Sequence, residues 1–217
     1  VIDCLDADTA VLMLSHVNYR DGAVHDMAGL TRVAHEAGAL VIWDLAHSAG
    51  VLPLDLAGCD VDFAVGCGYK FLNGGPGAPA FLYAAERHHG GFAQPLSGWF
   101  GHADPFGFDP HYRPAGDITQ YLCGTPPVIS MVALEAALEL WDKVDLRDVH
   151  AKSQALTDFF IELVEARCAG HGLTLISPRD AARRGAQVSL SHPTAGYAII
   201  SALIADGVIG DFRAPDI

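Results

Sequence analysis

Short apolar runs alternate with helical spacing in the first part of the chain. These runs are bounded by Gly, Pro or polar residues and are too short for helices, so they predict buried strands. Between the first two runs, apolar residues recur every three or four positions from Asp26 to Gly38, which predicts an amphipathic helix ending at a glycine. The predicted strands cover residues 10–14, 40–43, 60–65 and 78–83.

The pattern changes in the second part of the chain. Residues 86–125 show little periodicity and are rich in Gly, Pro, His and aromatic residues, and a loop of this length is uncommon unless it is functional. A helix is expected to begin at Pro126 or Pro127 and to run through Trp141, because proline suits the first helical position. Beyond it, the pattern predicts helices at 146–169 and 196–205 and strands at 173–176, 187–191 and 208–209.

This order of elements predicts an α/β fold. Strands buried on both faces and joined by helices form a three-layer sandwich around a mixed, mostly parallel sheet. The change of pattern places a domain boundary near residue 145: residues 1–145 would be part of a large domain, and residues 146–217 a linking helix and part of a small α+β domain. Ligands bind such sheets beyond the carboxyl ends of the strands. Ser15, Asp44 and Lys70 all follow strand ends, so they are expected to meet at one rim.

Schiff-base chemistry is the activity that these residues indicate. Lys70 is one of three lysines, and it lies between Tyr69 and Phe71 in an apolar, glycine-rich stretch where partial desolvation would free its amine. Asp44 ends an apolar strand, and His47 follows three residues later. Pyridoxal phosphate needs a lysine that bonds its aldehyde carbon and an acid that keeps its pyridine nitrogen protonated. The pattern therefore favours a site for this cofactor.

Each of these residues also has an ordinary structural explanation. Lys70 could be a solvated surface charge. Asp44 could cap a helix starting near Leu45, and His47 could bond within a turn. Ser15 carries little weight alone, since serine is common after a strand. The order of acid, histidine and lysine along neighbouring strands gives the cofactor interpretation its support.

Other kinds of site fit the sequence poorly. The glycines at residues 74–77 match neither GxGxxG nor the P-loop pattern, and they precede a strand instead of a helix, which argues against a nucleotide site. The histidines lack HExxH or paired Cys/His spacing, so no metal is expected. The net charge is −13 and no long basic run occurs, so nucleic-acid binding is not expected either.

Composition indicates the compartment and the extent of the chain. No apolar run reaches the length of a membrane span and no signal peptide is recognisable, so neither a membrane partner nor secretion is expected. The five cysteines include no CxxC pair, which favours reduced thiols in the cytoplasm. The sequence opens with Val1 and stops after Ile217 without a cap, so we expect a piece of a longer polypeptide.

Three motifs closely resemble those of the kynureninase family, a branch of the fold-type I, class V aminotransferase-like enzymes that use pyridoxal 5'-phosphate. The similarity extends over essentially the whole chain. Tyr-Lys-aromatic-Leu-Asn at residues 69–73 separates this family from the cysteine desulfurases, which usually carry a histidine before the lysine and a nucleophilic cysteine far downstream. No cysteine follows Cys168. The motifs are WDLAHSAG at 43–50, DFAVGCGYKFLNGGPG at 62–77 and GWFGH at 98–102.

The resemblance implies a role for each residue near the cofactor. Lys70 would carry it as a Schiff base and later move protons, while Asp44 would pair with the pyridine nitrogen. Tyr69 would reach the phosphate and assist acid–base steps. His47 and Ser15 would line the cofactor.

The resemblance also implies an active site shared by two subunits. Trp99 and Thr125 would contact the phosphate across a homodimer interface, and His102 would lie in the substrate pocket. Kynureninases extend upstream of residue 1 and continue past residue 217, where the arginine that binds the substrate carboxylate is expected. This piece alone is therefore expected to hold an incomplete site.

The reaction implied is hydrolysis of L-kynurenine or 3-hydroxy-L-kynurenine to L-alanine and anthranilate or 3-hydroxyanthranilate. It would serve tryptophan degradation or NAD biosynthesis. Two alternatives stay open. One is a desulfurase-like or other β-lyase that uses the same cofactor, and the other is a non-catalytic scaffold that has kept the fold.

Overall fold

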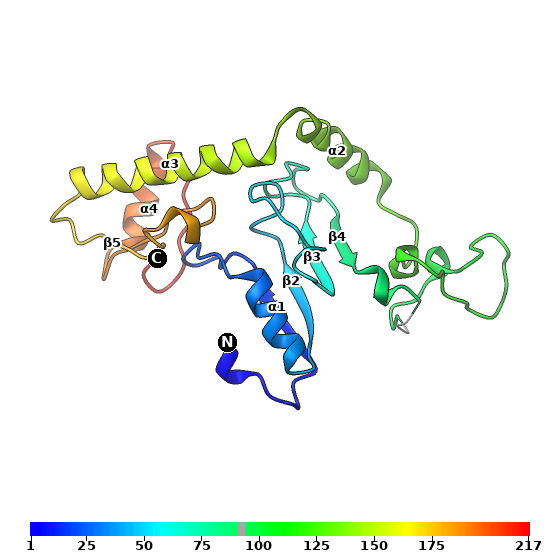
Figure 1. Cartoon of the computed structure of the whole chain (residues 1–217). Helices are drawn as coiled ribbons and strands as arrows, with labels where there is room; N and C mark the ends of the chain where they lie inside the picture. Colours follow the sequence, from blue (N-terminus) through cyan, green and yellow to red (C-terminus); the bar gives the residue numbers. More distant parts are fainter. Residues whose placement is uncertain (91–93) are drawn as a thin grey trace. The chain divides into compact units, whose positions relative to one another are not determined.

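The chain forms two compact units in a computed structural model that describes residues 1–90 and 94–217 (Figure 1). The first unit comprises Val1–Leu14, Asp26–Ala46 and Leu54–Lys143. The second comprises Ser15–His25, His47–Pro53 and Val144–Ile217. The assignment of residues 1–145 to a cofactor-binding domain and of residues 146–217 to a small domain stays a prediction.

A four-stranded sheet in the order β1-β2-β3-β4 forms the framework of the fold (Figure 1). β2 pairs with β3 in parallel, and Asp44 lies opposite Val65 in that pairing. β3 pairs with β4 in the antiparallel direction. The predicted α/β class with a mixed sheet is confirmed. The strands are β1 (Val11–Ser15), β2 (Leu40–Asp44), β3 (Phe63–Cys67) and β4 (Ala80–Ala84).

Helix α1 (Met27–Glu36) packs on β2 in the first unit. It begins at Asp26, whose carboxylate accepts a hydrogen bond of 3.0 Å from the Gly29 amide. On its buried face, the Thr31 hydroxyl accepts a hydrogen bond of 3.0 Å from the indole nitrogen of Trp43. Both side chains are fully buried, so this bond satisfies the polar atom that the large ring carries into the core.

β3 begins later than predicted, at Phe63 instead of residue 60. Asp60 adopts the left-handed conformation, with φ of 54°, which an extended strand does not tolerate. The Val61 amide then donates to the Leu56 carbonyl at 3.0 Å and closes a turn. The apolar run therefore includes the end of a turn as well as the strand, and hydrophobicity alone could not separate the two.

The segment expected to lack regular structure contains three short 3₁₀ helices within its described residues, 86–90 and 94–125. They are η2 (Glu86–His88), η3 (Trp99–Gly101) and η4 (Ile118–Tyr121). Helix α2 (Val128–Leu138) follows and ends before Trp141, where the prediction placed its end, because the chain tightens into η5 (Trp141–Lys143). A single-turn 3₁₀ helix has no room for a repeating apolar pattern, so periodicity misses it.

The second unit contains helices α3 (Leu146–Arg167) and α4 (Gly196–Ala205) and a hairpin of β5 (Thr174–Leu175) and β6 (Leu190–Ser191). The predicted strand at 208–209 is wrong. The Val208 amide instead donates to the Leu203 carbonyl at 2.8 Å and closes the end of α4. Across residues 1–90 and 94–217, none of the helices combines the length and apolarity needed to cross a membrane.

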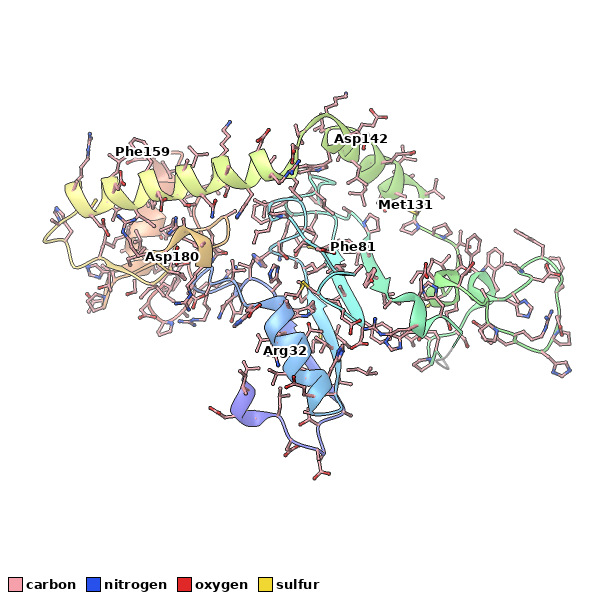
Figure 2. All side chains as sticks on the ribbon, viewed as in Figure 1. Arg32, Phe81, Met131, Asp142, Phe159 and Asp180 are labelled. Atoms are coloured by element: carbon pink, nitrogen blue, oxygen red, sulfur yellow. The ribbon has the colours of Figure 1, made fainter. Side chains whose placement is uncertain are left out.

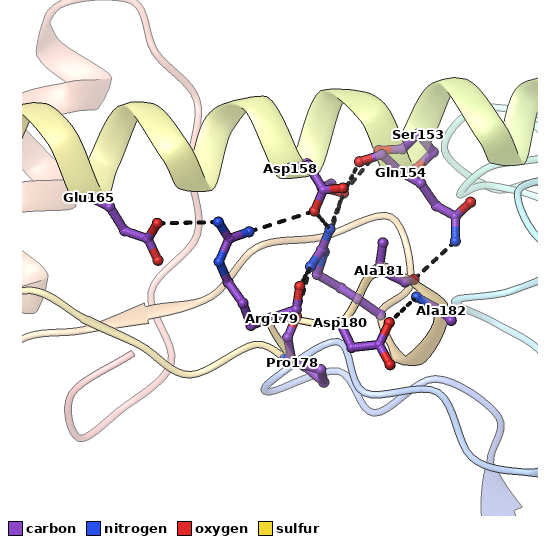
Figure 3. Close-up of polar contacts among 11 residues, drawn as sticks. Ser153, Gln154, Asp158, Glu165, Pro178, Arg179, Asp180, Ala181 and Ala182 are labelled. Atoms are coloured by element: carbon purple, nitrogen blue, oxygen red, sulfur yellow. Dashed lines mark hydrogen bonds and ion pairs between the residues drawn. The ribbon is translucent and has the colours of Figure 1, made fainter.

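A buried arginine joins α3 to the loop before β6. Arg184 is 1% exposed, and its guanidinium donates to the Asp158 carboxylate at 2.6 Å and to the Thr157 hydroxyl at 3.0 Å. It also donates to the Pro178 carbonyl at 2.7 Å. Figure 3 shows Arg179 from the same loop reaching Asp158, with an ion pair of 3.8 Å. The guanidinium therefore ties the loop to the helix through several bonds at once.

Substituting this arginine should destabilise the second unit. In Arg184→Leu, the carbonyl of Pro178 loses its donor inside the protein, and we expect a loss of about 2 kcal/mol in unfolding free energy. Arg183→Leu is the matched control, because Arg183 is exposed. Urea denaturation of both variants checks this, and equal stabilities would contradict it.

Candidate functional site

Asp44 lies at the carboxyl end of β2, where the sequence placed it. Its Oδ1 accepts a hydrogen bond of 2.8 Å from the Ala46 amide, which fixes the side chain against the following turn. The amide of Leu45, the residue directly after Asp44, donates to the Val65 carbonyl at 2.7 Å and continues the pairing with β3 past Asp44. The carboxylate is half-buried and held at the sheet edge. The segment after it forms turns, so it does not cap a helix.

Lys70 lies in a compact turn that follows β3. The Gly74 amide donates to the Gly68 carbonyl at 2.8 Å, and the Asn73 amide donates to the Lys70 carbonyl at 3.0 Å. The Gly68 amide in turn donates to the Pro79 carbonyl at 3.0 Å, which ties the turn to the residue before β4. These backbone bonds fix the position from which the lysine side chain extends.

Two glycines of this turn permit a close approach to α2. A Cβ on Gly68 would lie 3.0 Å from Leu134, and one on Gly74 would lie 2.9 Å from the same side chain. A Cβ would also lie 2.8 Å from the Pro79 carbonyl at the first position and 2.8 Å from the Gly68 carbonyl at the second, so a side chain at either would distort the turn itself. The half-buried Lys70 has its Nζ 5.6 Å from the ring centroid of Tyr69, which is itself 52% exposed.

The acid and the amine therefore lie at one edge of the sheet. β2 and β3 are parallel neighbours, and Asp44 is opposite Val65. The chain leaves β3 at Cys67 and turns at once into the segment that carries Lys70. The strand pairing therefore brings the two segments to the same edge, whereas the approach of the two side chains to one cofactor stays a prediction.

Ser15 and His47 belong to the second unit. Ser15 is the last residue of β1, and His47 lies in the turns that follow β2. Both side chains are half-buried. Their approach to the cofactor stays a prediction.

Trp99 and Thr125 lie on two segments that pack against each other. Gly98, just before Trp99, meets the backbone of Cys123, two residues before Thr125. A Cβ on Gly98 would overlap the Cys123 carbonyl, so only glycine allows this approach. Trp99 is 46% exposed and Thr125 is also exposed. Both predicted phosphate contacts thus remain accessible on one cluster of loops.

His102 is bound by its own loop. It is 7% exposed, its Nδ1 accepts from the Asp104 amide at 2.9 Å, and its Nε2 donates to the His111 carbonyl at 3.2 Å. Both ring nitrogens are therefore engaged by backbone groups that hold residues 102–111 together. The ring also lines a cavity of about 380 Å³, together with Phe100 and Asp117. Its role toward a substrate stays a prediction.

Sequence reasoning gave no role to Asp62 or to the glycines that pack the lysine turn. Asp62 is buried at 1% exposure directly before β3. The signal was an acid set inside an apolar run, since a buried carboxylate needs several donors. Among residues 1–90 and 94–217, no group of three or more His, Cys, Asp or Glu side chains is placed to hold a metal ion.

Comparison with known proteins identifies relatives for the whole chain. Residues 149–217 match a family model described as the kynureninase C-terminal domain. The chain is 54% identical over 213 residues to a kynureninase from Pseudomonas fluorescens, an alignment covering 98% of this chain and 51% of the relative. A kynureninase from Burkholderia mallei is 53% identical over 215 residues, covering 99% of this chain and 51% of the relative. The chain spans about half the length of these curated relatives.

Solved structures share the fold at lower sequence identity. A cystine C–S lyase in complex with cysteine persulfide is 22% identical, with a TM-score of 0.82 over 99% of this chain and 57% of that one. A cysteine desulfurase from Escherichia coli is 21% identical, with a TM-score of 0.76 over 96% of this chain and 49% of that one. At these identities the similarity establishes the fold alone.

The contact between the loops of Trp99 and Thr125 should depend on a glycine. In Gly98→Ala, the methyl group would displace the segment from Cys123, and we expect a loss of about 2 kcal/mol in unfolding free energy. Gly116→Ala is the control, since nothing lies within 4 Å of a Cβ there. Denaturant unfolding with limited proteolysis of the loops measures the effect. Equal behaviour of the two variants would refute the close contact.

Proposed function

We propose that the chain is part of a kynureninase and that the whole protein hydrolyses L-kynurenine or its 3-hydroxy derivative. The products are L-alanine and anthranilate or 3-hydroxyanthranilate, and the cofactor is pyridoxal 5'-phosphate. The placement of Asp44 and Lys70 at one edge of paired parallel strands carries the proposal. The reaction belongs to tryptophan degradation or NAD biosynthesis.

The residues of this edge fit the cofactor. The turn of Lys70 is fixed by backbone bonds and has glycines at its closest contacts, so the amine extends from a rigid base. Asp44 is held at the strand end by the Ala46 amide. An amine and an acid at fixed positions are the groups that a pyridine aldehyde needs for attachment and for protonation of its ring nitrogen.

The residues divide the work as follows. Bound pyridoxal phosphate supplies a ring that accepts the electrons released when bonds at the substrate carbons break. Lys70 holds the cofactor, and its Nζ removes the proton from the substrate Cα. The Asp44 carboxylate keeps the proton on the pyridine nitrogen, and the Tyr69 hydroxyl contacts the phosphate and assists proton transfer.

The remaining predicted residues hold the cofactor in place. Ser15 and His47 line it, while Trp99 and Thr125 bind the phosphate of the partner subunit's site. His102 lies near the substrate. Because its ring nitrogens are engaged by backbone groups, His102 acts by shaping its loop.

The alternatives have weaker support. A desulfurase or C–S lyase shares the fold at 21–22% identity, against 54% for a kynureninase. A desulfurase also needs a nucleophilic cysteine on a late loop, whereas Cys168 follows the last turn of α3. A scaffold that had lost catalysis would not be expected to keep Asp44, Tyr69 and Lys70 together.

Replacing the lysine tests the proposed function directly. In the protein at its full natural length, Lys70→Ala should remove the visible absorption of lysine-bound cofactor and reduce anthranilate formation from kynurenine by at least about 10³-fold. Lys143→Ala is the control, because Lys143 is exposed. Absorption spectra and anthranilate fluorescence are the measurements. Sulfide release from cysteine with kynurenine inert would support the desulfurase instead.

A homodimer with a shared active site is the proposed assembly. Helix α2 exposes Ile129 at 89%, Val128 at 60% and Met131 at 46%. Figure 2 labels Met131 on this helix. A helix with apolar residues around its circumference is normally buried. Because Thr125 lies just before this helix, a second copy packed on α2 would also meet the predicted phosphate contact.

The five cysteines form no disulfide, which fits a cytoplasmic location.

A charge on this face should weaken the dimer. Ile129→Asp would place a carboxylate in an apolar interface, and we expect at least about a tenfold rise in the dimer dissociation constant. Ile129→Val keeps the surface apolar and should leave assembly unchanged. Analytical ultracentrifugation of the full-length protein measures this, and a wild-type monomer or an unaffected Ile129→Asp dimer would exclude α2 as the interface.

A further inference from the structure

One buried carboxylate gathers donors from several elements at the end of the sheet opposite Asp44. Asp62 directly precedes β3 and is 1% exposed. The Val41 amide donates to it at 2.8 Å. Three side chains also donate to it, each at 2.7 Å: His35, Arg87 and His88. The backbone carbonyl of Asp62 accepts a further bond of 2.9 Å from Ala85.

These donors come from four parts of the first unit. His35 lies on α1, Val41 on β2, Ala85 follows β4, and Arg87 and His88 lie on η2. The carboxylate therefore joins α1, β2 and η2 to the start of β3, and the backbone carbonyl of the same residue adds the link to Ala85. Among the described residues no other carboxylate bonds to so many elements, although exposed Asp60 also contacts Arg87, at 2.8 Å, and His35, at 3.5 Å.

The cluster keeps Asp62 charged. Burial alone would raise the pKa of this carboxyl group, but the hydrogen bonds from His88, His35, Val41 and Arg87 outweigh burial and hold the pKa well below its ordinary value. A charged acceptor forms stronger hydrogen bonds than a neutral one. The bond to the Val41 amide is therefore a strong link between the starts of β2 and β3.

The bond between Val41 and Asp62 extends the pairing of β2 with β3 by one residue. Ile42 pairs with Phe63, so the neighbouring contact between Val41 and Asp62 extends the pairing at its amino end. At the other end, the Leu45 amide bonds to the Val65 carbonyl beside Asp44. β2 is thus held against β3 at both ends, and Asp44 lies within the held stretch.

We propose that Asp62 is a positioning residue for the cofactor site, setting the height of Asp44 along β2 relative to the segment that carries Lys70. Slippage between paired strands would displace the acid from the amine, and small displacements in a site cost large factors in binding and rate. The inference rests on the proposed function, because it concerns the same cofactor. Asp62 itself touches neither cofactor nor substrate.

The test compares Asp62→Asn with Asp60→Asn in the full-length protein. Asp60 shares Arg87 and His35 with Asp62 but is exposed and, within the described structure, does not bond to the β2 backbone. We expect Asp62→Asn to weaken pyridoxal phosphate binding about tenfold and to speed hydrogen exchange of the Leu45 amide in protein without cofactor. Asp60→Asn should change both by less than about twofold.

The outcomes separate positioning from simple stability. If Asp62→Asn lowers only the melting temperature and keeps cofactor affinity and Leu45 protection, Asp62 is a stabilising residue and the proposal is wrong. Equal effects of Asp60→Asn would assign the role to the charge cluster instead of the β2 bond, and would also overturn it.

A milder variant covers the case in which Asp62→Asn does not fold. Arg87→Gln removes one donor and should shift cofactor affinity and Leu45 exchange in the same direction by a smaller factor; wild-type values for both would contradict the proposal. The exchange measurement needs no cofactor, so it judges positioning separately. Failure of the proposed function would appear in the spectra of wild type and Lys70→Ala.

Discussion

The parallel pairing of β2 with β3 is the constraint on which the site depends. It is a backbone ladder, and each strand delivers one chemical group at the same end. Asp44 belongs to β2 itself, whereas Lys70 lies in the turn after β3, so their separation is set by the ladder and by the few bonds of that turn. Neither group depends on a long flexible loop for its position.

Glycines complete this arrangement by letting neighbouring groups approach the backbone closely. In the lysine turn they admit Leu134 of α2, and between the loops of Trp99 and Thr125 they admit the carbonyl of Cys123. At both contacts the glycine has no side chain, so its segment can pack directly on the neighbouring residue. Close packing at glycines therefore holds the turn of Lys70 and the loops of Trp99 and Thr125, which lie outside the strands.

The sequence predicted β1 to β6 and the helices α1 to α4 because their apolar runs and spacings are long enough to recognise, but it also predicted a strand at 208–209 that does not form. It placed Asp44 at the end of a strand and Lys70 just after the next one, because acids and amines at strand ends are rare in apolar surroundings, while their catalytic roles stay predictions. It missed the late start of β3, which depends on the left-handed backbone of Asp60, and the short 3₁₀ helices. It also missed the role of Asp62, whose donors come from positions 35, 41, 87 and 88 and meet only in the folded chain.

The loop of His102 has a consequence for how such a protein can vary in length. The Ala103 amide donates to the Arg113 carbonyl and the Ala115 amide to the Gly101 carbonyl. These two hydrogen bonds join the two ends of the loop at its base. The tip of the loop, which includes the highly exposed Phe108 at 87%, takes no part in these two hydrogen bonds. Extra residues or a reporter peptide inserted at the tip would lengthen the excursion outward while the base kept its shape.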